Sequence, residues 1–393
     1  MVMQNEKYIG RTLDKPIRDS MTPGRVTVIY GPRRVGKTTL LKKLVSEETG
    51  NTLLTTGEDA VTRAFLMSRN VEQIKKAFSR YALIVIDEAQ TIPEIGACLK
   101  MLVDWVPEAR VVVSGSSSFE LANQIGEPLT GRKLTFTMYP ISAQEIARQD
   151  GVLTLMQQRD DLLIYGSYPE ILMTSSNDEK RQRLMELCSD YLYKDILMWD
   201  NLRNAAKLRH LLAMLALQVG SECSLRELSG TLGFAIPTIT RYLDLLEKSF
   251  VIRRLGGFSQ NMRNEVTRHP KYYFYDNGIL NALLQNFNPV SIRPDVGVLW
   301  ENWLVMERLK KLAYSKSAAT PYFWRTYTRS EVDWVEAENG SLHGYEFKWG
   351  DKTRPRSLRA WRQAYPQAAC TLINRDSFLG FVAEDGGIPP VKL

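Results

Sequence analysis

The chain has 393 residues, of which 44% are hydrophobic and 24% charged, and a formal net charge of +7. This composition is typical of a folded globular protein, and the length predicts roughly two to four domains rather than one core. Four cysteines without a C-x-x-C pair and three separated histidines argue against disulfides, zinc sites and histidine-based triads. No apolar segment is long enough to cross a bilayer and no signal region opens the chain, so we expect a cytoplasmic protein that does not bind membranes.

The first predicted strand, over residues 26–30, runs directly into a glycine-rich loop that is followed by a predicted helix. The loop fits G-x-x-x-x-G-K-[ST] with these residues: Gly31, Pro32, Arg33, Arg34, Val35, Gly36, Lys37, Thr38 and Thr39. In this context backbone N–H groups cradle phosphates, Lys37 reaches the β- and γ-phosphates, and the Thr38 hydroxyl ligates Mg²⁺. The motif predicts binding of a nucleoside triphosphate, and the lack of an N-K-x-D stretch favours ATP over GTP.

A second motif is the apolar run over residues 81–86, which ends in Asp87 and Glu88. Such runs are typical of buried strands in parallel sheets, whose carboxyl ends carry active-site residues. Asp87 would lie beside Thr38 and hold Mg²⁺ through water, and Glu88 would orient or deprotonate the attacking water. Alone, the run would indicate an acidic turn after a core strand; together with the phosphate loop it indicates ATP hydrolysis.

A third predicted strand, over residues 110–118, carries hydroxyls at its end. Ser114 and Ser116 stand where additional-strand ATPases place a sensor of the γ-phosphate, although serine turns after strands are common. Arg132 is a candidate arginine finger, acting in cis or from a neighbouring subunit, and the alternative is a solvated surface arginine. Ser142 and Glu145 form a predicted capping box, which would open a further helix. We expect the ATPase domain to end after this helix and to span residues 1–160.

The middle of the chain, residues 161–275, is predicted to be a helical linker followed by a winged helix. Helices are expected from Ser224 to Gly233 and from Pro237 onward, with a buried stripe formed by Ile236, Ile239, Leu243 and Leu246. Strands at 250–255 and 272–275 would form the hairpin, with a turn at residues 256–257. Ten basic residues against five acidic ones between 201 and 270 favour DNA contact, although a winged helix also serves as a protein-packing module.

Residues 276–393 are predicted to form an α/β domain. Asp333 and Glu346-x-Lys348, on two paired strands, have the spacing of the PD-(D/E)xK nuclease hairpin, and Glu301 is an additional candidate carboxylate on a helix. Such a cluster is a candidate second metal site, where two acids hold Mg²⁺ and the lysine activates water. A charged hairpin on a solvated sheet is the alternative, and Val332 stands where the motif has proline. Five basic residues between 352 and 362 suit a DNA-backbone contact.

Taken together, the chain resembles the bacterial and archaeal AAA+-like ATPases that carry a C-terminal domain of unknown function related to restriction-endonuclease folds. The matching stretches are GPRRVGKTT, the run ending IDEAQ, SGSSS, LTGRK, YGSYPE, KYYFYDNG, LWENW, EVDW and YEFK. The resemblance implies an α/β P-loop domain that uses Lys37, Thr38, Asp87 and Glu88, with Arg132 as a finger. It also implies a winged-helix middle and a nuclease-like end at Glu301, Asp333, Glu346 and Lys348.

We therefore expect a Mg²⁺-dependent ATPase whose nucleotide state controls a DNA-contacting winged helix and a nuclease-like tail. One alternative is an ATP-gated, metal-dependent nuclease. The other is a non-enzymatic, nucleotide-switched scaffold that binds a protein partner or further copies of itself.

Overall fold

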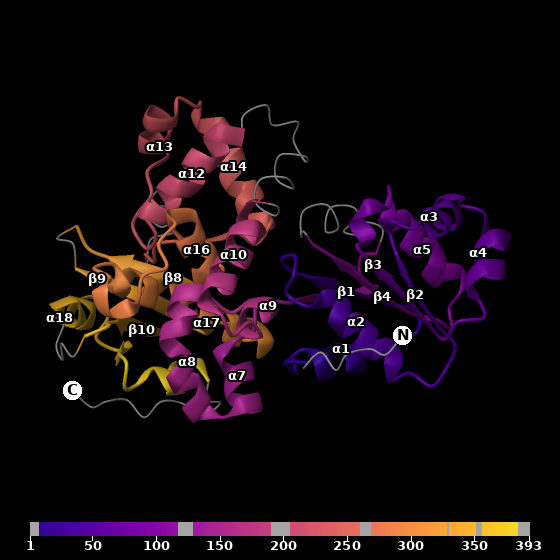
Figure 1. The fold of residues 1–393 in the computed structure, drawn as a ribbon, viewed down its shortest axis with the longest axis horizontal. Coiled ribbons are helices and arrows are strands. Elements are labelled where there is room, and N and C mark those ends of the chain that lie inside the picture. The colour runs from indigo at the N-terminus through magenta and orange to yellow at the C-terminus, as the bar shows by residue number, and fades with distance from the viewer. Residues whose placement is uncertain are drawn as a thin grey trace. The chain divides into compact units, whose positions relative to one another are not determined.

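The computed structural model describes residues 8–116, 129–189, 205–259, 269–327, 330–350 and 356–383 (Figure 1). The chain forms two compact units: Met1–Pro140 with Lys248–Phe250, and Ile141–Glu247 with Val251–Leu393. The first unit ends at Pro140, ahead of the boundary at residue 160 that we expected. The reason is that the next helix, Ala143–Asp150, packs against the helix Val152–Tyr165, which packs in turn against later helices of the second unit.

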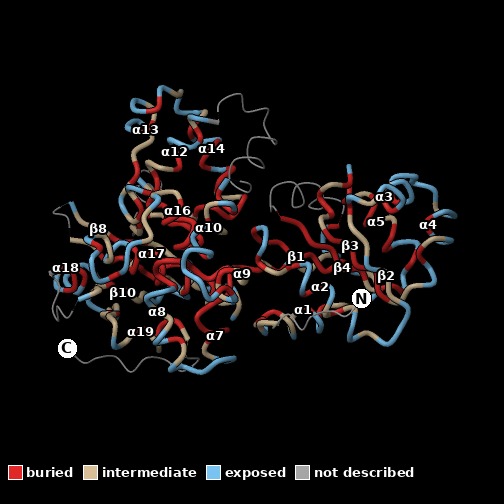
Figure 2. The backbone as a smooth tube through the Cα atoms, viewed as in Figure 1, coloured by how far each residue is buried: buried red, intermediate tan, exposed pale blue. Residues whose placement is uncertain are grey.

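The first unit alternates strands and helices: α1 (Asp14–Ser20), β1 (Val26–Tyr30), α2 (Lys37–Ser46), β2 (Thr52–Thr56), α3 (Ala60–Met67), α4 (Val71–Phe78), β3 (Leu83–Asp87), η1 (Ala89–Thr91), α5 (Ile95–Trp105), β4 (Arg110–Gly115) and β5 (Lys133–Thr137). The five strands form one parallel sheet in the order β2-β3-β4-β1-β5. Strand β4 lies between β1 and β3, as in additional-strand ATPases. The three central strands are buried almost throughout, whereas β2 and β5 at the edges are partly exposed (Figure 2).

The second unit begins with α7 (Ala143–Asp150), α8 (Val152–Tyr165), α9 (Pro169–Leu172), α10 (Asn177–Leu187), α12 (Ala205–Leu217), α13 (Leu225–Leu232), α14 (Ile236–Lys248), β6 (Ile252–Leu255), β7 (Lys271–Phe274), α16 (Asn277–Leu284) and η3 (Val290–Ile292). The predicted capping box opens α7: Ser142 Oγ accepts from Glu145 N, and the Glu145 carboxylate accepts from Ser142 N. Strands β6 and β7 pair antiparallel after α13 and α14, which is the order of elements that we expected for a winged helix.

Two details of this region differ from the prediction. Ile236 is 39% exposed, because α14 begins at that residue and the buried stripe is formed further along the helix by Ile239, Leu243 and Leu246. Residues Gly256–Phe258 do not turn back on β6. They continue in extended form beside β8, where Gly256 O accepts from Phe323 N at 2.9 Å and Phe258 N donates to Phe323 O at 2.6 Å. Residues 260–268, which connect this segment to β7, lie outside the described residues.

The remaining elements are α17 (Val296–Tyr314), β8 (Thr320–Arg325), β9 (Glu331–Glu338), β10 (Ser341–Phe347), α18 (Arg356–Ala364), β11 (Ala369–Ile373) and α19 (Phe378–Val382). Their sheet has the order β11-β10-β9-β8, with β8, β9 and β10 antiparallel and β11 parallel to β10. Asn339 and Gly340, with φ of 50° and 80°, make the tight turn between β9 and β10. One face of the sheet buries Trp324, Val332 and Val335 against Trp361 of α18.

Buried polar contacts hold the start of the second unit in place. Glu307 and Lys310, both on α17, pair at 2.7 Å and are almost fully buried. Glu307 accepts from Ala143 N at 2.7 Å, and Lys310 donates to Ile141 O at 3.1 Å. The chain that enters this unit is therefore fixed by two charged side chains. Among the described residues, no helix combines the length and the apolar character needed to span a membrane.

Candidate functional site

The glycine-rich loop follows β1 as predicted, and its path depends on close backbone contacts. Gly31 has a φ of 154°, and a Cβ there would lie 2.1 Å from the carbonyl oxygen of Met138. Gly36, with a φ of 97°, leads directly into α2, which begins at Lys37. The loop thus opens a helix at the carboxyl end of a central strand, where N–H groups and the helix dipole attract anions.

Lys37 is 5% exposed, and its ammonium group donates to two loop carbonyls, Gly31 O at 2.9 Å and Pro32 O at 2.8 Å. Burial lowers the pKa of Lys37 from its ordinary 10.5 to about 8, although Glu88 and Asp87 oppose this shift. Because its direct partners are neutral carbonyls, the lysine is a cation that an incoming phosphate would neutralise.

Asp87 lies at the end of β3, and its side chain contacts the first turn of α2 and the end of β4. Its Oδ2 accepts from the Thr38 hydroxyl at 2.5 Å, and its Oδ1 accepts from Glu88 N at 3.0 Å and from the Ser114 hydroxyl. The register explains why Asp87 meets Ser114, because Ile86 of β3 lies opposite Val113 of β4 and each of these two residues comes next in its strand. A hydroxyl beside a carboxylate is an oxygen donor set that fits Mg²⁺, so Thr38 and Asp87 are the residues that could hold it. Ser114 thus contacts Asp87, and its role as a phosphate sensor stays a prediction.

Glu88 adopts a left-handed φ of 47° that turns the chain away from β3. Gln90, whose role the sequence did not reveal, donates both to the Glu88 carboxylate and to Ser116 Oγ, the latter at 3.0 Å. A Cβ on Gly57 would lie 2.6 Å from Glu88 O, so β2 also packs closely here. Gln90 therefore fixes the carboxylate that we expect to orient water.

Arg11 is a further residue of this site that sequence reasoning missed. It is 6% exposed and donates to Val35 O, inside the phosphate loop, at 2.7 Å and to Tyr139 O at 2.5 Å. One guanidinium thus braces the loop against the segment after β5. A single arginine ahead of the first strand matches no motif that we used, so the sequence offered no signal for it.

Arg132 does not lie where a finger acting in cis would be needed. Strand β5 runs parallel to β1 with Lys133 opposite Val26, at the start of β1, whereas the phosphate loop follows the end of that strand. The Arg132 side chain is 51% exposed and pairs with Asp104. The role in cis therefore does not fit this register, and a role in a neighbouring subunit stays a prediction.

The second unit brings together the residues of the predicted nuclease hairpin. We use the name carboxylate cluster for a set of six residues: Glu301, Glu331, Asp333 and Glu346 with Lys271 and Lys348. Lys348 pairs with Glu346 at 2.7 Å, and Asp333 accepts from Phe347 N at 2.7 Å. Lys271, on β7, pairs with Glu301 and Glu331. Burial raises the pKa of Asp333 well above its ordinary value, and Glu301 and Glu346 add to the shift.

The metal-binding arrangement that we expected at this cluster is not formed. Across the described part of the chain, no group of three or more histidine, cysteine, aspartate or glutamate side chains is arranged to hold a metal ion. The physical reason is that ammonium groups approach these carboxylates. Of the predicted basic edge, Arg359 and Arg362 are exposed on α18, and residues 351–355 lie outside the described part.

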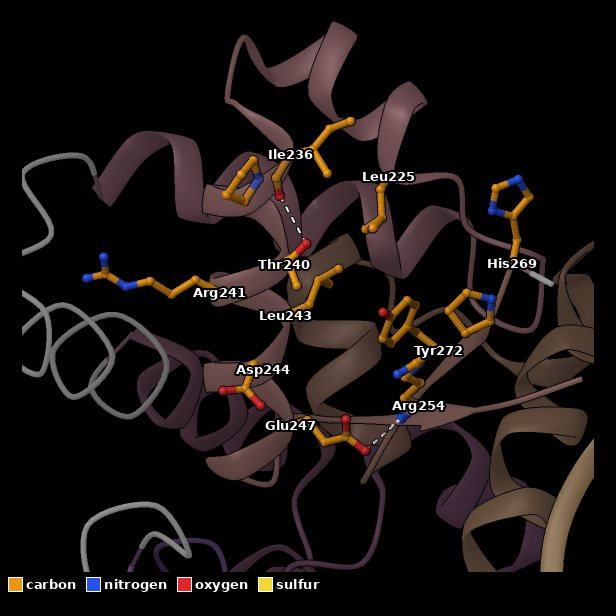
Figure 3. A pocket seen from close by; sticks show the side chains of 12 residues that line it. Leu225, Ile236, Thr240, Arg241, Leu243, Asp244, Glu247, Arg254, His269 and Tyr272 are labelled. Atoms are coloured by element: carbon orange, nitrogen blue, oxygen red, sulfur yellow. Dashed lines mark hydrogen bonds between the residues drawn. The ribbon is translucent and has the colours of Figure 1, made fainter. Parts of the chain in front are cut away.

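A pocket of about 790 Å³ lies beside α14 and the β6–β7 hairpin (Figure 3). Leu243 and Tyr272 line it together with acidic Asp244 and Glu247, and Glu247 accepts from Arg254 N at 3.3 Å. Arg241 extends away from the other side chains drawn (Figure 3). Helix α14 thus carries acids as well as Arg241, and the DNA contact that we expected of the winged helix stays a prediction.

Three family profiles match consecutive parts of the chain. The profile of the AAA domain matches residues 23–147. Profiles of two domains of unknown function match residues 156–290 (DUF8612) and 296–381 (DUF4143). The first unit is therefore an AAA-type, P-loop ATPase domain, which implies that it binds ATP.

Proteins of similar sequence extend over most of the chain. The uncharacterized protein Rv2008c of Mycobacterium tuberculosis is 30% identical over 342 residues, which cover 84% of this chain and 72% of that protein. The chain belongs to this family of AAA-domain proteins. The uncharacterized protein MJ1544 of Methanocaldococcus jannaschii is 21% identical over 382 residues, or 90% of this chain and 82% of that protein. A structure of RuvB from Thermotoga maritima aligns with a TM-score of 0.32 at 15% identity, over 63% of this chain and 91% of that chain.

Proposed function

We propose that the chain is a Mg²⁺-dependent ATPase whose nucleotide state regulates the second unit, and that the second unit acts on DNA. The observation that carries the proposal is the convergence of Lys37, Thr38, Asp87 and Glu88 at one edge of a parallel sheet. Lys37 would bind the phosphates, and Glu88, fixed by Gln90, would orient the attacking water. Thr38 and Asp87 would hold Mg²⁺, which supplies charge neutralisation of the transferred phosphate.

The connection between the units supports regulation by the nucleotide. The Met138 carbonyl lies against Gly31 of the phosphate loop, and Tyr139 O shares the Arg11 guanidinium with Val35 O. A little further along the same segment, Ile141 O accepts from Lys310 in the second unit. A shift of the phosphate loop would therefore act on a short segment that is anchored at both ends.

The test is a steady-state ATPase assay with and without Mg²⁺, on the natural chain and on Glu88→Gln. We expect Mg²⁺-dependent turnover in the natural chain. In the variant, turnover should fall by about a hundredfold to a thousandfold while ATP binding is retained, because only the group that orients water is changed. Unchanged turnover in Glu88→Gln would remove this residue from its proposed role.

The same assay with single- and double-stranded DNA tests the second part of the proposal. Stimulation of turnover by DNA, with binding that weakens steeply as salt rises, would support it. Absent or salt-insensitive DNA binding would favour the alternative of a nucleotide-switched scaffold for a protein partner. We do not favour an ATP-gated nuclease, because two of the residues that would hold its metal, Glu301 and Glu346, pair with lysines.

A further inference from the structure

Lys271 reaches the carboxylate cluster from β7, a strand that precedes the C-terminal sheet in the chain. Its side chain is 1% exposed, pairs with Glu331, and places Nζ 3.4 Å from Glu301 Oε1. Tyr273, on the same face of β7, donates to that Glu301 oxygen at 2.7 Å. The β6–β7 hairpin thus supplies both a cation and a hydrogen-bond donor to acids carried by α17 and β9.

Other acids of the carboxylate cluster also have positively charged neighbours. Glu346 pairs with Lys348 at 2.7 Å, and Arg325 Nε lies 3.6 Å from Glu331 Oε2. Burial on its own would lower the pKa of Lys271, but Glu301, Glu331 and Asp333 outweigh it and raise this pKa above its ordinary value. Each glutamate of the cluster therefore has a cationic partner supplied by the chain itself, and Lys271 stays charged.

A divalent metal requires several oxygen ligands that converge on one point at roughly 2.0–2.6 Å. Within the described residues the acids do not converge in this way, and an ammonium group stands between Glu301 and Glu331. One oxygen, Glu346 Oε2, is buried without a hydrogen-bond partner, and a single acceptor is not a coordination set. We propose that Lys271 is a built-in counter-cation that takes the place of a divalent metal in the carboxylate cluster and ties the β6–β7 hairpin to the C-terminal sheet.

The test is a Mn²⁺ titration followed by electron paramagnetic resonance, without nucleotide so that the phosphate loop does not contribute. In the natural chain we expect no Mn²⁺ site at the carboxylate cluster, so Mn²⁺ binding should be the same with and without Asp333→Asn. The double variant Lys271→Met with Glu331→Gln loses one cation and its closest acid, so the net charge is kept while Glu301, Asp333 and Glu346 remain. It should gain a site at least about tenfold tighter, which corresponds to ~1.4 kcal/mol, and that site should be lost again when Asp333→Asn is added.

Lys271→Arg is the matched control, because it keeps the charge and should bind Mn²⁺ as weakly as the natural chain. Binding by the natural chain at a site that Asp333→Asn removes would overturn the proposal. So would Mg²⁺- or Mn²⁺-dependent nicking of plasmid DNA that Asp333→Asn abolishes, or a folded double variant that gains no site. If the double variant does not fold, the titration and the nicking assay on the natural chain decide alone.

Discussion

The phosphate loop and the carboxylate cluster both place a lysine near aspartate and glutamate. The two sites differ in the direct partners of that lysine and in the direction in which its pKa is shifted. Lys37 donates to carbonyl oxygens, and burial lowers its pKa to about 8. Lys271 is as deeply buried, but it pairs with Glu301 and Glu331, which raise its pKa. The first lysine is left for an anionic ligand to neutralise, whereas the second is neutralised by its own chain.

This difference teaches that a lysine next to acids in a motif does not reveal whether the site binds a ligand. In the loop motif, the partners of Lys37 are carbonyls a few residues away, so the local sequence determines them. In the nuclease-like motif, the decisive partner of the acids is Lys271, which lies 60 residues before Glu331. The motif at Asp333 and Glu346 could not predict it.

Replacing each lysine by alanine should separate the two sites most clearly. Lys37→Ala should lower ATP turnover by about a hundredfold to a thousandfold while changing the free energy of unfolding by less than about 1 kcal/mol. Lys271→Ala should lower the free energy of unfolding of the second unit by about 3–5 kcal/mol, because it leaves buried acids without their cation. The measurements are ATPase assays and urea unfolding followed by the fluorescence of buried Trp300 and Trp334.

Lys348→Ala serves as a control for the ATPase arm, since Lys348 pairs with Glu346 in the second unit and should leave turnover by the phosphate loop within about twofold. The comparison fails if Lys37→Ala unfolds the protein or if Lys271→Ala leaves the unfolding free energy unchanged.

A smaller effect is expected from the backbone of the loop. In Gly31→Ala the new methyl group would meet Met138 O at 2.1 Å, so the loop or the segment after β5 must move. We expect a loss of about 3 kcal/mol in local stability, seen as faster hydrogen exchange in β1, together with weaker ATP binding. Gly24→Ala is the matched control, because Gly24 also has a positive φ but nothing lies within 4 Å of the added Cβ. Equal exchange rates in the two variants would contradict the packing argument.

The sequence predicted the first unit well because its signals are local. The strand before the loop, the helix that begins at Lys37 and the acids after β3 are all where the pattern indicated. The ATPase domain itself is confirmed by the family match. The capping box at Ser142 is confirmed as well, since its two hydrogen bonds span three residues.

Contacts between distant residues could not be predicted in this way. Asp276 accepts from Ser167 N at 2.7 Å, and a Cβ on Gly166 would lie 1.9 Å from its Oδ1. The stretches YGSYPE and YDNG, which stood apart in the sequence, thus meet in one buried contact. Asn302, within LWENW, accepts a hydrogen bond from Phe274 N and donates one to Phe274 O on β7. The position of Arg132 near the start of β1 could not be predicted either, because only the register of β5 reveals it.

Arg11 should have a moderate effect on the phosphate loop. Arg11→Ala removes two hydrogen bonds from a charged donor to Val35 O and Tyr139 O, and we expect ATP affinity to fall about tenfold. Arg11→Lys should recover part of this loss, because one donor is kept. Arg18→Ala is the control, since Arg18 is exposed and its ion pair with Glu47 lies at the surface. Fluorescence titration with a labelled ATP analogue gives the affinities, and equal values for Arg11→Ala and Arg18→Ala would dismiss the bracing role.

An effect of similar size is a pH dependence that arises from Lys37. Its pKa in the free protein is about 8, so the charged form predominates below that pH and is lost as the pH rises through it. Because the phosphates bind the charged form, the apparent affinity for ATP should fall about tenfold between pH 7 and pH 9, in proportion to the charged fraction. Lys37→Arg, whose guanidinium stays charged over this range, should show an affinity that does not change with pH. A flat profile for the natural chain would mean that Lys37 keeps its charge despite its burial, and the contrast with Lys271 would then rest on their hydrogen-bond partners alone.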